Sequence, residues 1–179
     1  MFPIEAFQST LAKFTVILRS LQIRFHLTGG LTGTAYGEPR MTQDIDIVID
    51  PVQSKIMIDE LVARITRSDF MHSEASVRQA IESDGMFQLL DNTECLKLDI
   101  YSREMIPGEL SRSVMLEIFA GESLPVVSRV DAAASKLVWI GKGSHKSRRD
   151  FRAIFRYASQ AEKNLIGQSA KELGLQDLF

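Results

Sequence analysis

The chain has 179 residues, of which 45% are hydrophobic and 25% charged, and its formal net charge is −2. That composition is typical of one globular domain with a core, and it excludes overall attraction to nucleic acid, so such a contact requires a local basic patch. The single cysteine, Cys95, excludes an internal disulfide. The first residues lack a signal peptide's basic start, and no apolar run approaches the roughly 20 residues of a membrane span. We therefore expect a cytoplasmic protein that forms a single domain over 1–179, with no membrane segment.

The first half of the chain mixes helical and strand patterns. Apolar residues recur at helical spacing up to residue 21, and an alternating β-rich segment follows until Gly29 and Gly30 break it. Asp50 before Pro51, with Gln53 two residues on, is typical of a helix start. The expected elements are helix 4–21, strand 23–28, a short helix ending before 39, strand 44–49, a helix from 50 to about 67, and helix 73–81.

The second half changes from strands to helices. Turn residues at 91–94 separate two β-rich segments, which predicts an antiparallel hairpin, and a second strand pair follows. The expected elements are strands 86–90, 95–102, 114–120 and 124–128, and helices 130–140, 147–159 and 161–173. We therefore expect an α+β fold, with a mixed sheet and flanking helices over 1–128 and a C-terminal helical lobe over 129–179.

Asp44 and Asp46 stand inside an isoleucine-rich strand, although strands disfavour aspartate. Because side chains alternate along a strand, the two carboxylates share one face and the isoleucines share the other. Burial explains the isoleucine face. The aspartate face must border solvent or a site. An Asp-x-Asp pair also occurs by chance, and Asp50 is already explained as a helix cap.

The segment 95–102 has the same division, with Asp99 on its polar face. If this strand lies beside 44–49 with the apolar faces aligned, Asp99 points toward Asp44 and Asp46. Three carboxylates held together raise one another's pKa, and a divalent cation removes the conflict. Carboxylate oxygens suit Mg²⁺ or Mn²⁺. Alternatively, Asp99 is a surface aspartate on a half-exposed strand.

These residues resemble the nucleotidyltransferases of the polymerase-beta-like superfamily. That family has a Gly-Gly or Gly-Ser turn, then Asp-x-Asp on a strand, then a third carboxylate on a neighbouring strand. The resemblance is closer to the minimal, toxin-like branch, which includes the nucleotidyltransferase half of abortive-infection toxin–antitoxin pairs. It covers roughly residues 27–154 and rests on Gly29-Gly30, Arg40-x-Thr42-x-Asp44-Ile45-Asp46, Asp99, Lys136-Leu137 and Arg149-Asp150. Two positions depart from the pattern: Gly30 replaces a frequent serine, and Ala153 replaces a frequent second aspartate.

The resemblance implies transfer of a nucleoside monophosphate from a nucleoside triphosphate such as ATP, with release of pyrophosphate. In such a two-metal scheme Asp44 and Asp46 bridge the ions, and Asp99 binds one ion and accepts the nucleophile's proton. Asp150 is expected to orient Lys136 or Arg40. The implied catalytic and metal-binding residues are Asp44, Asp46 and Asp99, and the implied nucleotide-binding residues are Gly29, Gly30, Thr32, Arg40, Thr42, Lys136 and Asp150. Structural alternatives are a solvated Arg40 and a Lys136 that extends from an apolar face to water.

The stretch from 141 to 152 holds most of the local positive charge. Positive charge is unfavourable at a helix N-terminus, so the stretch favours an anionic partner, either triphosphate or RNA, over a merely solvated helix start. The candidate RNA-binding residues are Lys142, Lys146, Arg148, Arg149 and Arg152.

Three functions follow from this sequence. The first is a metal-dependent nucleotidyltransferase whose acceptor is a transfer RNA, a protein or a small molecule, acting as a toxin with a cognate antitoxin. The second is a non-catalytic descendant that binds nucleotide or a partner, which Gly30 and Ala153 keep open. The third is an antibiotic-modifying nucleotidyltransferase.

Overall fold

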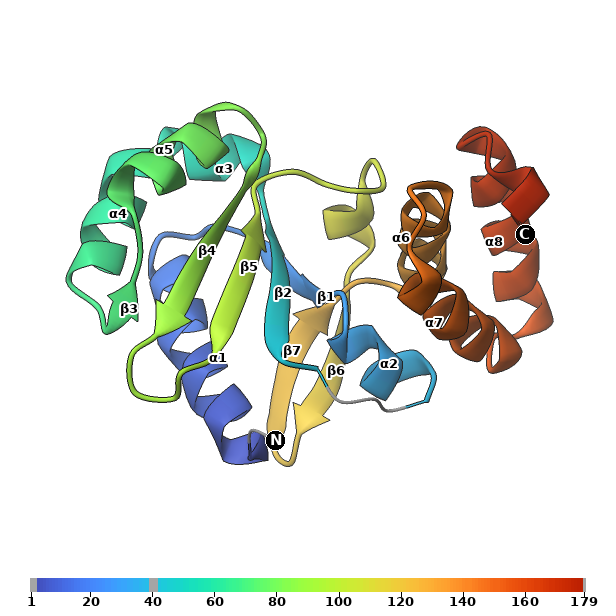
Figure 1. Cartoon of the computed structure of the whole chain (residues 1–179), viewed down its shortest axis with the longest axis horizontal. Coiled ribbons are helices and arrows are strands. Elements are labelled where there is room, and N and C mark those ends of the chain that lie inside the picture. The colour runs from blue at the N-terminus through green and yellow to red at the C-terminus, as the bar shows by residue number, and fades with distance from the viewer. Residues whose placement is uncertain (1–2, 39–41, 179) are drawn as a thin grey trace.

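A computed structural model describes residues 3–38 and 42–178 of the chain (Figure 1). Within these residues a seven-stranded mixed sheet has the order β3-β4-β5-β2-β1-β7-β6. This arrangement of a mixed sheet with flanking helices is the predicted fold class. The strands are β1 (Phe25–Thr28), β2 (Asp44–Ile49), β3 (Phe70–Met71), β4 (Met86–Asp91), β5 (Lys97–Tyr101), β6 (Val114–Phe119) and β7 (Glu122–Val126).

The helices surround the sheet unevenly. Helix α1 lies behind the sheet in Figure 1, α3 to α5 lie at the end near β4, and α6 to α8 stand together beyond α2. The helices are α1 (Ile4–Ser20), α2 (Leu31–Tyr36), α3 (Pro51–Ile56), α4 (Ile58–Thr66), α5 (Glu74–Glu82), α6 (Arg129–Gly141), α7 (His145–Arg156) and α8 (Gln160–Glu172), with short 3-10 segments at Glu109–Arg112 and Gln176–Leu178. Among the described residues, every helix falls short of the length and apolar character that a membrane crossing demands.

The apolar face of β2 belongs to the core. Ile45, Ile47 and Ile49 are fully buried, as are Leu11 and Phe14 of α1, and all five belong to one hydrophobic cluster. Burying each such side chain stabilises the fold by about 1.5–3 kcal/mol. Because the isoleucines fix which way the strand faces, Asp44 and Asp46 are turned to the opposite side of the sheet.

The two strands that carry the aspartates are neighbours, as the matching patterns predicted. Strand β2 pairs with β5 in parallel, and the register places Asp46 opposite Asp99 and Ile45 opposite Leu98. Residues far apart in the chain therefore present their polar side chains on one face of the sheet.

One local expectation was wrong, and one short strand was not predicted. The helix expected from 50 to 67 is interrupted at Met57, whose φ of −101° and ψ of 18° separate α3 from α4. No proline or glycine stands there, so no sequence signal marks the break. The start of this helix is as predicted, because the Asp50 carboxylate accepts hydrogen bonds from the Val52 and Gln53 amides. Strand β3 was not predicted, since two residues are too short to show a pattern.

Candidate active site

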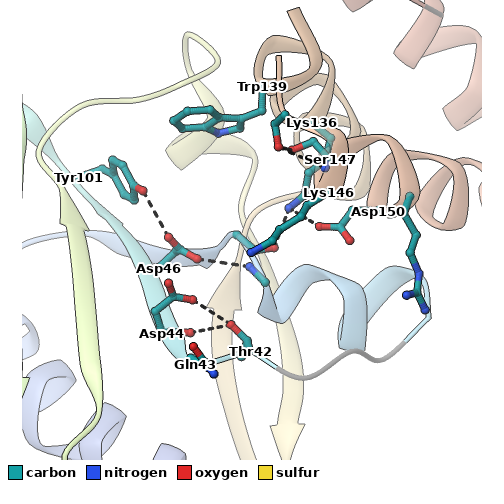
Figure 2. Close-up of a pocket in the computed structure, with 14 residues that line it drawn as sticks. Thr42, Gln43, Asp44, Asp46, Tyr101, Lys136, Trp139, Lys146, Ser147 and Asp150 are labelled. Atoms are coloured by element: carbon teal, nitrogen blue, oxygen red, sulfur yellow. Dashed lines mark hydrogen bonds and ion pairs between the residues drawn. The ribbon is translucent and has the colours of Figure 1, made fainter. Parts of the chain in front are cut away.

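Asp44 and Asp46 face a cavity of about 800 Å³ between the sheet and helices α6 and α7 (Figure 2). Several predicted site residues line it: Gly29, Gly30, Thr42, Asp44, Asp46, Lys136 and Asp150. The fold therefore brings together residues that lie more than a hundred positions apart. Arg40 lies outside the described residues.

The Gly29-Gly30 turn is built around Asp46. Gly29 has a φ of +64°, and a Cβ added there would lie 1.8 Å from Asp46 Oδ2. The Gly30 amide donates a hydrogen bond of 3.3 Å to the same oxygen. Only glycine meets both the left-handed backbone and the close approach at position 29. The paired glycines thus let the backbone touch the carboxylate, and the amide of Gly30 serves Asp46.

Asp46 is held by neutral donors. Its Oδ1 accepts a hydrogen bond of 3.3 Å from the Tyr101 hydroxyl, and the Gly30 amide contacts Oδ2. Burial raises the pKa of Asp46, and the negative charge of Asp44 raises it further. The pKa of Tyr101 is raised by its burial and by the charge of Asp46, so the phenol stays protonated and donates. Because burial and the charge of Asp44 both oppose ionisation of Asp46, a cation beside the two carboxylates would stabilise their charged forms.

Asp44 is positioned by Thr42. The Thr42 hydroxyl lies 3.0 Å from both the carbonyl oxygen and Oδ1 of Asp44, and it donates to these acceptors. The threonine of the Arg-x-Thr-x-Asp pattern therefore fixes the strand start and the first carboxylate together.

Lys136 and Asp150 form a buried ion pair on the opposite wall. Lys136 Nζ lies 3.0 Å from Asp150 Oδ2, and both side chains are less than a tenth exposed. The same ammonium donates a hydrogen bond of 3.1 Å to the carbonyl of Gly29. The expected orientation of Lys136 by Asp150 is thus seen in the geometry, and Lys136 ties α6 to the glycine turn.

Thr32 has a different place from the one expected. Its side chain is buried, and its hydroxyl donates a hydrogen bond of 2.7 Å to the Gly29 carbonyl. It does not belong to the cavity lining. Thr32 therefore stabilises the turn. This geometry gives no support to the expected contact between its hydroxyl and phosphate.

Asp99 lies on the same face of the sheet as Asp46, but both of its carboxylate oxygens already have side-chain partners. Its Oδ1 accepts 3.0 Å from Gln88 Nε2, and its Oδ2 lies 3.0 Å from Lys97 Nζ. Within residues 3–38 and 42–178, no three His, Cys, Asp or Glu side chains are grouped so as to hold a metal ion. The three carboxylates therefore do not form such a group in this structure, where Asp99 is paired with Lys97 of the same strand. Asp44 and Asp46 alone fit Mg²⁺, which needs only one or two carboxylates beside water and phosphate.

Residues outside the predicted set complete the cavity. The predicted RNA-binding candidates divide, since Lys146 and Arg149 line the cavity whereas exposed Arg148 and Arg152 do not. Lys142 lies 5.0 Å from the Trp139 ring centroid. The unpredicted lining residues are Gln43, Tyr101, Trp139, Ser144 and Ser147. Sequence signals existed for two, because Tyr101 follows Asp99 at strand spacing and Trp139 follows Lys136 by three helical residues.

Ala153 has a packing explanation. It is buried where α7 meets α2, and a Cβ added to Gly37 would lie 3.1 Å from the Ala153 methyl. Ala153 therefore packs closely against the end of α2, and the Lys136–Asp150 pair forms without an acidic residue at position 153.

Three solved structures resemble this chain along nearly its whole length. The solution structure of the antibiotic-resistance factor ANT(2'')-Ia has a TM-score of 0.63 at 12% identity, covering 99% of this chain and 97% of that one. The crystal structure of ANT(2'')-Ia with adenylyl-2''-tobramycin has a TM-score of 0.58 at 12% identity, covering 96% and 99%. An antigenic nucleotidyltransferase-like protein from Paracoccidioides brasiliensis has a TM-score of 0.52 at 20% identity, covering 92% of each chain. Likeness at such identities establishes the nucleotidyltransferase fold.

The sequence establishes the family. Residues 16–156 match the family described as the AbiEii nucleotidyl transferase toxin of type IV toxin–antitoxin systems. The match covers most of the chain, so the chain belongs to this family and is a nucleotidyltransferase. No curated protein matches the chain at a significant level.

Proposed function

We propose that this nucleotidyltransferase moves a nucleoside monophosphate from a nucleoside triphosphate to an acceptor and depends on Mg²⁺ or Mn²⁺. One observation carries the proposal: the Asp44–Asp46 pair faces Lys136, Lys146 and Arg149 across one cavity of about 800 Å³. One wall of the cavity carries carboxylates that suit a divalent ion, and the other carries cations that suit phosphate. Together they match what a metal-bound triphosphate requires.

The proposed roles follow from the contacts. Asp44 and Asp46 hold the divalent ion, which would neutralise charge on the phosphates. Lys136 presents a fixed positive charge, since Asp150 and the Gly29 carbonyl hold its ammonium in place. Lys146 and Arg149 supply further charge at the mouth. As the acceptor hydroxyl attacks the α-phosphorus, the bond to pyrophosphate breaks, pyrophosphate leaves, and the hydroxyl proton passes to solvent.

The buried Lys136–Asp150 pair also supports one domain over 1–179. Lys136 of α6 contacts Asp150 of α7 and the turn between β1 and α2, so the site needs both 1–128 and 129–179. We propose that the helical lobe does not work apart from the sheet.

The acceptor is the second part of the proposal. The family is one of toxins in toxin–antitoxin pairs, and we propose a cytoplasmic toxin that is held in check by a cognate antitoxin. Exposed Lys142, Arg148 and Arg152 extend the positive charge away from the cavity. That extension favours RNA as the acceptor, because phosphate contacts supply most non-specific affinity for nucleic acid.

Labelled triphosphates test the proposal. The protein is incubated with Mg²⁺, total RNA and each of four nucleoside triphosphates labelled at the α-phosphate, and label in RNA is measured on a denaturing gel. We expect transfer that EDTA and the double change Asp44→Ala/Asp46→Ala abolish. Persistent transfer in the double variant would overturn the catalytic assignment.

A second acceptor class is an aminoglycoside. It is favoured by the similarity to ANT(2'')-Ia, which extends over 99% of this chain. Replacing RNA with tobramycin in the same assay separates the two. Label on tobramycin and none on RNA would decide for an antibiotic-modifying enzyme.

A further inference from the structure

Lys97 brings a positive charge into the acidic cluster from within the sheet. It stands on β5 directly opposite Asp44 of β2, and two residues before Asp99. Side chains two apart on a strand share a face. Its ammonium lies 3.0 Å from Asp99 Oδ2 and 3.8 Å from Asp44 Oδ2. Sequence order and strand register together therefore fix a lysine beside two of the three carboxylates.

The lysine divides the cluster into two parts. Asp99 has both oxygens engaged, one by Lys97 and one by Gln88. Asp46 contacts neutral donors, and among the described residues no lysine or arginine forms an ion pair with it. A divalent ion that approaches Asp99 must therefore compete with a permanent neighbouring cation.

The Lys97 side chain reaches solvent. Lys97 is 38% exposed at its side chain, unlike Lys136, which is 7% exposed in its ion pair. Asp99 is only 10% exposed, but the ammonium of Lys97 reaches solvent, so the lysine can exchange the carboxylate for water once another cation occupies Asp99. Lys97 is therefore a displaceable partner and Lys136 a fixed one.

We propose that Lys97 is a positioning residue that acts as the resident counter-cation of this site, which rests on the proposed function. It neutralises Asp99 in the free enzyme and limits strong divalent-ion binding to Asp44 and Asp46. It leaves Asp99 only when a divalent ion takes its place.

The test measures binding rather than turnover. Full-length protein without nucleotide is titrated with Mn²⁺, and free Mn²⁺ is followed by electron paramagnetic resonance. Lys97→Met removes the charge and keeps the stem, and should bind Mn²⁺ about tenfold more tightly, since a unit charge a few ångströms away repels a divalent ion. Lys97→Arg keeps the charge and should bind as the wild type does. Lys55→Met is the matched control, because Lys55 pairs with Asp84 at 2.7 Å on an exposed surface of α3.

Two further variants separate the possible failures. Lys97→Met/Asp99→Asn should return to wild-type affinity if the gain comes from released Asp99, and thermal unfolding confirms that each variant folds. Equal affinity for wild type and Lys97→Met, with weakened binding by Asp46→Asn, overturns the role of Lys97 alone. Equal affinity for wild type and Asp46→Asn overturns both this role and the proposed metal site.

Discussion

Two aspartates of one sheet, Asp46 and Asp91, have opposite surroundings. Asp91 ends β4 and is fully buried, yet Lys13 Nζ lies 2.8 Å from its Oδ1 and the Thr10 hydroxyl donates 2.8 Å to its Oδ2. Burial opposes ionisation of Asp91, but the hydrogen bonds from Lys13 and Thr10 outweigh it and lower the pKa. At Asp46 burial and the charge of Asp44 raise the pKa.

The difference separates structural from functional carboxylates. A fold normally pairs a buried charge, because burying it unpaired costs several kcal/mol. Asp91 follows that rule and joins α1 to the β4–β5 turn. Asp46 lies beside Asp44, and among residues 3–38 and 42–178 it has no ion pair, so the described partners leave its charge uncompensated. That contrast is the physical argument for a ligand site at β2.

The largest expected difference between the two aspartates is the loss of activity when Asp46 is neutralised. Asp46→Asn should lower nucleotidyl transfer about 10³-fold, since it removes a ligand at the reacting phosphates, while the protein stays folded. Transfer of α-phosphate label and thermal unfolding are the two measurements. Asp91→Asn is the matched control and should retain activity. Comparable activity loss in both variants would contradict the distinction.

Removing Lys136 should affect stability and activity together. Lys136→Met breaks a buried ion pair, which costs about 3–5 kcal/mol of unfolding free energy, and it also removes a charge from the cavity. Urea unfolding measures the first effect and label transfer measures the second. Lys97→Met should lose less unfolding free energy, because the Lys97 side chain is 38% exposed whereas that of Lys136 is 7% exposed. If the two variants lose equal stability, the buried pair does not have its assigned structural role.

A comparison of Gly29 with Gly121 separates the cost of a left-handed backbone from the cost of a steric clash. Gly29→Ala and Gly121→Ala both place alanine at positive φ, but only position 29 has a neighbour close to the added methyl. Left-handed strain alone costs about 1–2 kcal/mol, which is the loss expected for Gly121→Ala. Gly29→Ala should lose more unfolding free energy and also activity, because the methyl displaces Asp46. Wild-type activity in Gly29→Ala would show that the close approach is dispensable.

Asp91→Asn sharpens the structural side. It removes the charge that Lys13 and Thr10 bind and should lower the unfolding free energy by about 1–3 kcal/mol, as measured by urea denaturation at neutral pH. Asp59→Asn is the control, because Asp59 is 86% exposed in its pair with Arg78. The control should change stability by under about 0.5 kcal/mol.

The smallest expected effect is a difference in pH dependence. The pKa of Asp91 is lowered on folding, so its contribution to stability is present above the unfolded value of about 3.9 and is lost as pH falls through the folded pKa. The pKa of Asp46 is raised, so its ionisation costs stability as pH rises from about 3.9 through the folded pKa. Asp46→Asn should therefore gain stability at neutral pH, and the gain should vanish in acid. Unfolding at pH 3 to 7 measures both.

Much of the site was predictable from the sequence because period-two patterns carry it. The isoleucines of β2 bury one face of that strand, and Leu98 and Ile100 bury one face of β5. The faces of Asp44, Asp46 and Asp99 therefore follow once the strands are neighbours. The break at Met57 and the two-residue strand β3 had no local signal. Thr32 was assigned to phosphate because a hydroxyl after a glycine turn fits that role, whereas its own turn takes the hydrogen bond.

The sequence by itself determined which faces are apolar, where helices begin and which residues carry charge, because these are local properties of side chains and spacing. Only the tertiary structure decided which charges meet. The parallel register of β2 and β5 set Lys97 opposite Asp44, and the packing of α6 and α7 buried Lys136 against Asp150. Electrostatic energy decreases with the distance between charges, so partners brought close by packing, and not by order in the chain, decide which aspartates have a cation beside them.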